Sequence, residues 1–229
     1  MSEKERFAEL CKIMDTLLGE NGCPWDRAQT HQSLRPHLLE ESYEVADAID
    51  NNDMAALREE LGDLLLHVIL HSRIADKDGY FSLADVIGEV TEKLIRRHSH
   101  IFGPTKALGK SPDEVEKLWE ANKNKEKEIS TPLVNMQAVP KALPALARAQ
   151  KIVQRSGKNF LSNDVIRELH LTLNKAADDS IPETEKMEMY GNILFLLAAL
   201  LTKMQINAEF SLTNATQAFI NNFKHSEPT

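Results

Sequence analysis

The chain has 229 residues, of which 42% are hydrophobic, so it can bury a core in one large domain or two small ones. Its formal net charge of −8 argues against DNA or RNA as the main partner, because such proteins usually present a basic surface. Strand-like alternation hardly occurs, whereas helical periodicity recurs along most of the sequence. We therefore expect a soluble all-α protein.

The sequence contains no stretch typical of a signal peptide or a membrane anchor. The first ten residues, MSEKERFAEL, lack an apolar core. The longest uninterrupted apolar run, at residues 193–201, is far shorter than the roughly 20 residues that a spanning helix needs. Cys11 and Cys23 form neither a disulfide framework nor a cysteine-based metal motif, which fits a reducing compartment. We expect a cytoplasmic protein with no membrane partner.

A change of composition near residue 120 divides the helical pattern into two parts. Residues 121–140 are charged, contain prolines and show no sustained period, which predicts a linker. Both parts have the same order of a helix, a polar break, a very apolar helix and a closing helix. The very apolar helix lies at 58–70 in the first part and at 186–200 in the second. This repeat predicts two tandem helical-bundle units at 1–120 and 141–229.

Three carboxylates crowd one side of the helix predicted at residues 38–50. Glu40, Glu41 and Glu44 lie within about one turn of one another, where like charges repel by a few tenths of a kcal/mol per pair. A solvated acidic face is a sufficient explanation for this stretch considered by itself.

The helix predicted at 58–70 carries a polar stripe on an otherwise apolar surface, so we expect little of it to face water. Glu60, Asp63, His67 and His71 fall within an arc of about 80° at helical spacing. Carboxylates on a mostly buried helix need compensation, and a divalent cation could hold those of both helices together. An all-oxygen set suits Mg²⁺ or Mn²⁺. We expect the two histidines to lie beside this cation rather than to bind it.

A di-iron bundle is the competing metal site, but it requires Glu-x-x-His on two helices. No glutamate in this sequence has a histidine three residues later. The closing helix of the first part instead supplies positive charge, because Lys93, Arg96, Arg97 and His100 share one face. That face is either solvated or, beside a bound cation, a place for a polyphosphate.

Four stretches of the sequence together match a known protein family. They are NGCPWD (21–26), LLEESYEVADAI (38–49), LREELGDLLLHV (57–68) and EKLIRRH (92–98). These stretches resemble the MazG family of nucleoside triphosphate pyrophosphohydrolases, whose hallmark is E-E-x-x-E followed by E-x-x-D. Residues 139–152, VPKALPALARAQKI, are similar to the segment that joins the two units of full-length members. The resemblance therefore covers nearly the whole chain.

The resemblance implies an all-α, usually dimeric protein that hydrolyses a nucleoside triphosphate to a monophosphate and pyrophosphate with Mg²⁺. Glu40 is then expected to orient or deprotonate the attacking water. Trp25 either stacks on a base or anchors the core. The implied metal ligands are Glu41, Glu44, Glu60 and Asp63. The implied phosphate-binding residues are Lys93, Arg96 and Arg97.

The second part keeps the apolar scaffold but lacks every one of these charged groups. The residues at the equivalent positions are Leu171, Asn174, Met189, Asn192, Ala218, Asn221 and Asn222. We therefore expect one active site, in the first unit, and a second unit that serves stability, dimer contacts or regulation. The alternative is a second unit that binds another ligand through polar groups such as His170.

Two alternatives to a broadly specific enzyme stay open at this point. Nothing in the acidic motif recognises a base, so the motif leaves the substrate specificity open. The specificity could be narrow, for dUTP or for a modified or damaged nucleotide. The chain could also be a non-enzymatic dimerisation or regulatory module that keeps a metal site only for stability.

Overall fold

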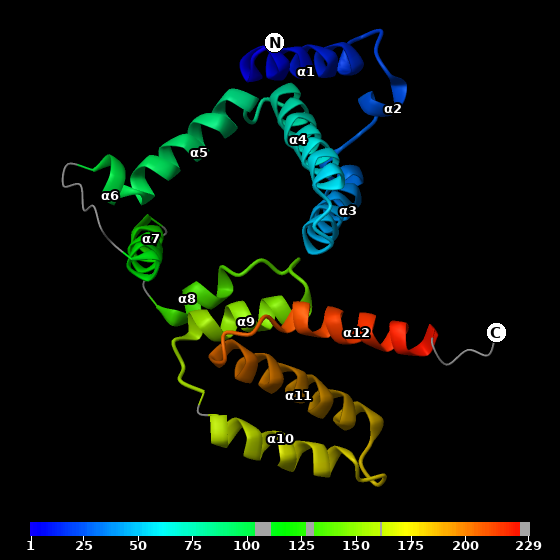
Figure 1. Cartoon of the computed structure of the whole chain (residues 1–229), viewed down its shortest axis with the longest axis vertical. Helices are drawn as coiled ribbons and strands as arrows, with labels where there is room; N and C mark the ends of the chain where they lie inside the picture. The colour runs from blue at the N-terminus through cyan, green and yellow to red at the C-terminus, as the bar shows by residue number, and fades with distance from the viewer. Residues whose placement is uncertain (104–110, 127–130, 161, 225–229) are drawn as a thin grey trace. The chain divides into compact units, whose positions relative to one another are not determined.

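The computed structural model describes residues 1–103, 111–126, 131–160 and 162–224. Every regular element in these ranges is a helix and none is a strand, which confirms the predicted all-α class (Figure 1). The chain divides into two compact units, Met1–Trp119 and Glu120–Thr229, which we describe separately.

The first unit is built around a hairpin of two long helices, α3 and α4, which lie side by side (Figure 1). Helix α1 packs on α4, and α5 contacts α4 and α6. The helices are α1 (Glu3–Leu18), α2 (Pro24–Arg27), α3 (His31–Asp50), α4 (Met54–Lys77), α5 (Leu83–Arg97), α6 (Ser99–Phe102) and α7 (Pro112–Glu126), which crosses into the second unit.

Local hydrogen bonds fix where the two hairpin helices begin. Thr30 and Ser33 form a reciprocal capping box at the start of α3, with N–H to hydroxyl distances of 2.9 and 3.1 Å. Between the helices, Asn52 has a φ of 54°, a left-handed conformation that asparagine tolerates. Asp53 then accepts two N–H groups from the first turn of α4, each at 3.0 Å. This short turn sends α4 back along α3.

The core of the first unit lies between α1, α3, α4 and the start of α5. Its buried residues are Met14, Leu34, Ile69, Leu70 and Leu83. All the buried residues of α4 lie between His67 and Ala75, in its second half. In the first half, Leu61 is 50% exposed and Leu65 is 39% exposed. The expectation that little of this helix faces water is therefore wrong for the single chain, because the first half of α4 contributes no buried residue to the core.

The second unit contains another helix hairpin, formed by α10 and α11, with α9 packed on α11. Its buried core residues are Val165, Leu169, Ile193 and Leu196. The buried Gln150 side chain of α9 donates to the Ile206 carbonyl at 2.8 Å and accepts the Ala208 N–H at 2.9 Å, which ties α9 to the start of α12. The helices are α8 (Pro132–Gln137), α9 (Ala145–Ser156), α10 (Ser162–Ala176), α11 (Glu183–Lys203) and α12 (Ala208–Lys224).

The predicted linker, 121–140, contains helical residues. It includes the end of α7 and all of α8, while 127–130 lie outside the described residues. The proposed domain bounds stay a prediction. Within the described ranges no single helix has the length and hydropathy of a membrane span, although α11 and α12 together, bent by 108°, meet that test.

The substitution Ile69→Ala tests the core of the first unit. Ile69 is 0% exposed, so the shorter side chain removes apolar contacts and leaves a cavity, which typically costs about 2–5 kcal/mol. Urea denaturation followed by circular dichroism should show a loss of that size. The matched control is Ile13→Ala in α1, where the residue is 51% exposed and the expected change is below about 0.5 kcal/mol. Equal losses of unfolding free energy in the two variants would contradict this assignment of the core.

Candidate metal centre

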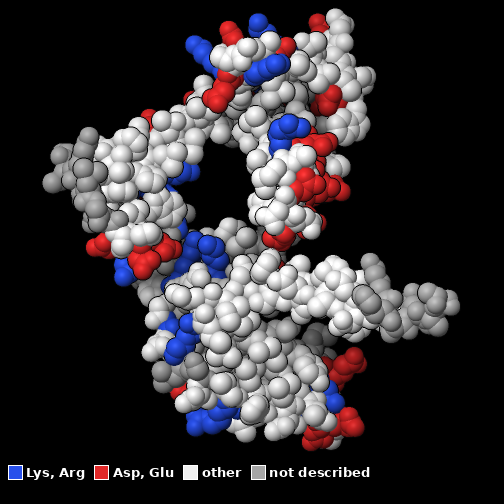
Figure 2. Space-filling model, in the orientation of Figure 1, with Lys and Arg blue, Asp and Glu red and all other residues white. Residues whose placement is uncertain are grey.

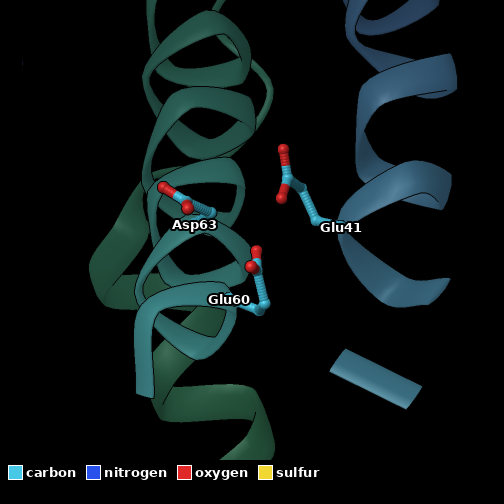
Figure 3. A group of neighbouring side chains, drawn as sticks. All are labelled: Glu41, Glu60 and Asp63. Carbon is cyan, nitrogen blue, oxygen red and sulfur yellow. The ribbon is translucent and has the colours of Figure 1, made fainter. Parts of the chain in front are cut away.

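Three carboxylates from α3 and α4 converge on one side of the hairpin. Glu41 extends from α3 toward α4, where Glu60 and Asp63 project from successive turns (Figure 3). One carboxylate oxygen from each residue lies within 4.8 Å of the others. The three-residue spacing puts Glu60 and Asp63 on one face of α4, and the hairpin turn places Glu41 opposite them. Figure 2 shows acidic side chains gathered over the region of this hairpin.

The carboxylates disfavour one another's charged forms. Burial raises the pKa of Glu41, and a hydrogen bond with Glu44 and repulsion from Asp63 raise it further. Burial likewise raises the pKa of Glu60, followed by repulsion from Glu44. Both effects act against ionisation, since burial removes water from the charge and a neighbouring negative charge repels it. A positive ion among these groups would reverse the second effect.

The donor set fits a small, hard divalent cation. All three donors are carboxylate oxygens, and all three residues are partly exposed, so an ion reaches them from solvent. Mg²⁺ takes oxygen ligands at about 2.1 Å and usually retains several waters, so it needs only a few protein ligands. Small side-chain rotations bring oxygens that lie within 4.8 Å into one such shell. Cysteine and histidine are absent from this group of three.

The structure places the other two predicted acidic residues differently. Glu44 is not in the group of three, but its charge acts on both Glu41 and Glu60. Glu40 lies beside His37 on the same helix, with 3.6 Å between a carboxylate oxygen and the imidazole Nδ1, and its side chain is 65% exposed. The convergent group therefore holds three of the four predicted ligands.

The predicted phosphate-binding residues lie on α5, away from the carboxylates of the same chain. In the described part of the unit, α5 makes no contact with α3 and meets α4 only to a small extent. Arg96 is 3.7 Å from Glu92 on its own helix. Arg97 is buried, and its guanidinium lies 4.9 Å from the ring centre of Trp119. Lys93 is exposed. One chain by itself does not bring this basic face to the acidic group.

The two tryptophans have opposite surroundings. Trp25 in α2 is 58% exposed, so it does not anchor the core and its ring is open to a ligand. Trp119 in α7 covers Arg97 and was missed by the sequence analysis. The available signal was an aromatic residue within the largely charged stretch DEVEKLWE, but sequence alone does not indicate which side chain it covers.

The pKa shifts predict how stability depends on pH in the cation-free protein. A raised pKa of Glu41 favours the folded state below the ordinary value of 4.5, and that advantage is lost as the pH rises through the raised value. Glutamine carries no charge at any pH. In EDTA, Glu41→Gln should therefore have a higher melting temperature than wild type at pH 7 and an equal one below pH 4.5.

The matched control is Glu89→Gln, which removes an exposed carboxylate of α5. Surface substitutions of this kind usually change stability by less than about 0.5 kcal/mol, so the melting temperature of this variant should stay close to that of wild type. Calorimetry over a pH series measures both variants. A Glu41→Gln protein that melts below wild type at pH 7 in EDTA would show that repulsion does not dominate this cluster.

Comparison with known proteins points to the same hairpin. The sequence-family model of the MazG nucleotide pyrophosphohydrolase domain matches residues 29–102, which include α3, α4 and α5. The chain is 36% identical over 223 residues to the nucleoside triphosphate pyrophosphohydrolase/pyrophosphatase MazG of Thermotoga maritima. This alignment covers 96% of this chain and 85% of that protein. The nucleoside triphosphate pyrophosphohydrolase of Escherichia coli K12 is 34% identical over 216 residues, 91% of this chain and 81% of its own. The chain belongs to the MazG nucleotide pyrophosphohydrolase family, a family of hydrolases.

Proposed function

We propose that this protein hydrolyses nucleoside triphosphates to a nucleoside monophosphate and pyrophosphate at one Mg²⁺ site in the first unit. The observation that carries the proposal is the convergence of Glu41, Glu60 and Asp63 in the region that matches the family domain. Glu44 is proposed as the fourth ligand, since its charge reaches two of these carboxylates. Mn²⁺ has similar ligand preferences and is the alternative ion. The names of the Thermotoga maritima and Escherichia coli relatives support the reaction.

The chemistry of the proposed reaction fits these residues. A bound divalent cation polarises phosphoryl oxygens and lowers the pKa of a coordinated water. Water forms a new P–O bond, the bond between the α and β phosphates breaks, and pyrophosphate leaves. Glu40 is proposed to orient this water or accept its proton, and its exposed carboxylate is accessible for that role. Trp25, also exposed, is proposed to stack on the base.

We further propose that the active form is a homodimer in which a second copy supplies the phosphate-binding side chains. Lys93, Arg96 and Arg97 lie on a helix that does not contact α3 of its own chain. The hairpin also leaves a set of large apolar side chains exposed, which a second copy would bury. They are Leu39, Tyr43, Leu61, Leu65 and Val68. Positive groups at this place would offset the charge on the departing pyrophosphate.

The second unit, from residue 141, is proposed to hold no active site and to serve stability, dimer contacts or regulation. Leu171, Met189 and Asn192, which stand at the positions of three ligands, line one cavity of about 500 Å³. The hairpin of α10 and α11 thus keeps a hollow at this place with no carboxylate at these three positions, although Glu185 and Glu188 also lie on its wall. Lys175 lies on the same wall, and its side chain is 3.4 Å from that of Glu185.

The nucleotide is proposed as the only phosphate partner, with no nucleic-acid polymer or membrane, in a cytoplasmic protein. The net charge of −8 supports the first part of this proposal. Because the carboxylates act on phosphate through a cation and read no base, we propose broad nucleoside triphosphate specificity. A panel of canonical, dUTP and oxidised or deaminated triphosphates tests this: activity with only one of them would indicate a narrow specificity instead.

Asp63→Asn tests the metal site and the single-site proposal together. Replacing a residue that only supports a metal ligand typically lowers metal affinity or activity roughly 10–100-fold. Replacing a ligand itself should therefore lower the rate of pyrophosphate release by more than about 100-fold. The rise in melting temperature that Mg²⁺ gives wild type should shrink as well. The matched control is Asp76→Asn, an exposed aspartate of the same helix, which should keep both properties. Wild-type activity in Asp63→Asn would show that catalysis does not depend on this carboxylate group, and the second unit would become a candidate for the active site.

Mixing two inactive variants tests whether the basic face comes from a second copy. Lys93→Ala and Asp63→Asn should each be inactive or slow as pure proteins. If the site combines α5 of one chain with the carboxylates of another, a mixed dimer has one intact site. Random exchange of subunits at equal amounts should then restore about a quarter of wild-type activity. No recovery, with dimers verified by light scattering, would place both sets of residues in one chain.

A further inference from the structure

Three histidine side chains form a cluster beside the carboxylate group but separate from it. His67 and His71 lie one and two turns beyond Asp63 on α4, and His31 is the first residue of α3. The ring centres of His31 and His71 are 5.1 Å apart, and those of His67 and His71 are 6.1 Å apart. His67 is only 6% exposed. The proposed hydrolysis assigns no role to any of these imidazoles.

Two nitrogens of this cluster are buried without a hydrogen-bond partner among the described residues. They are Nδ1 of His67 and Nε2 of His71. A buried polar atom left unpaired typically costs about 1–3 kcal/mol, so such atoms usually have a partner. Burial, with a contribution from His37, lowers the pKa of His67, and burial, with a contribution from His31, lowers that of His71. At neutral pH both rings are therefore neutral, and each has one nitrogen with a free lone pair.

The contact with His31 is compatible with the tautomer of His71 that metal binding requires. The two Nδ1 atoms are 2.7 Å apart, so one of them carries the hydrogen and the other accepts it. When His71 Nδ1–H donates, His71 Nε2 keeps its lone pair. This arrangement is the usual one for a metal-binding histidine, whose second ring nitrogen donates its N–H to a neighbouring acceptor.

We propose that His67 Nδ1 and His71 Nε2 bind a transition-metal ion, with His31 as a positioning residue that holds His71 in the required tautomer. Histidines four residues apart on a helix lie on one face and chelate divalent metals in this way. An ion about 2.1 Å from one nitrogen of each ring lies about 3 Å from each ring centre, so it bridges centres up to about 6 Å apart. The observed 6.1 Å is at this limit, and a small rotation of either ring shortens it.

The chemistry of the donors separates this ion from the one held by the carboxylates. Imidazole nitrogens suit Zn²⁺, Ni²⁺ and Cu²⁺, whereas Mg²⁺ prefers oxygen. Two histidines leave the remaining coordination positions to water or another small ligand. His31 also lines a cavity of about 700 Å³ between α1, α2, α3 and α4, so solvent reaches the outer edge of the cluster.

Calorimetric titration of the full-length protein with Zn²⁺ tests the site. The Asp63→Asn variant is the background, because it weakens the carboxylate group. Zn²⁺ should bind this variant, and adding His71→Gln should weaken binding by at least about tenfold, because one of the two imidazole ligands is lost. The matched control is His170→Gln, which removes an exposed imidazole of α10 and should leave Zn²⁺ binding unchanged. Circular dichroism verifies that each variant is folded.

Long-range ¹H–¹⁵N NMR spectra of the wild-type histidines provide a measurement that needs no substitution. Zn²⁺ should shift the Nδ1 signal of His67 and the Nε2 signal of His71 and leave His71 Nδ1 protonated. The same tautomer should persist in His31→Gln, which keeps an acceptor, and be lost in His31→Ala. Unmoved imidazole signals, an absence of Zn²⁺ binding, or binding that Asp63→Asn abolishes and His71→Gln does not affect would each overturn the proposal.

Discussion

Repulsion among carboxylates is the constraint on which the first unit depends. The packing of α3 against α4 brings Glu41 to the face that carries Glu60 and Asp63. Glu41 and Glu60 would ionise more easily alone in water, as their raised pKa values indicate. The hairpin is held by caps at Thr30 and Asp53 and by the core in the second half of α4, so the carboxylates cannot separate freely. A divalent cation bound among these carboxylates, as we propose, would compensate this repulsion.

The single chain leaves two features of the first unit incomplete. The first half of α4 exposes large leucine side chains to solvent. Helix α5, which carries the basic residues, does not contact α3. Both features have the same physical origin, since no further helix among the described residues of the first unit packs along α3 on that side. A second copy that packs on the hairpin would bury the leucines and deliver positive charge together. In such a dimer, substrate binding would depend on dimerisation.

Each of the two units contains a helix hairpin with an apolar core, and only the first hairpin carries the carboxylates that we propose as metal ligands. Ile193 and Leu196 pack the second hairpin as Ile69 and Leu70 pack the first. Apolar packing depends on the pattern of large side chains facing the core and tolerates changes on the other face. A metal site depends on each ligand, because losing one carboxylate removes both charge and a coordinating oxygen. If the proposed ligands are correct, the different residues at these positions of the second unit would affect chemistry far more than folding.

The sequence by itself determined the helical class, the acidic motif on two neighbouring helices and the family, because helical periodicity and motif spacing are local properties. Helical spacing alone also indicated that Glu60 and Asp63 share one face of their helix. Only the tertiary structure decided that Glu41 of α3 faces Glu60 and Asp63 of α4. The same holds for Trp119 over Arg97, and for His31 beside His71. Such pairings depend on the turn between helices and on the packing that fixes each helix rotation, which no local pattern encodes.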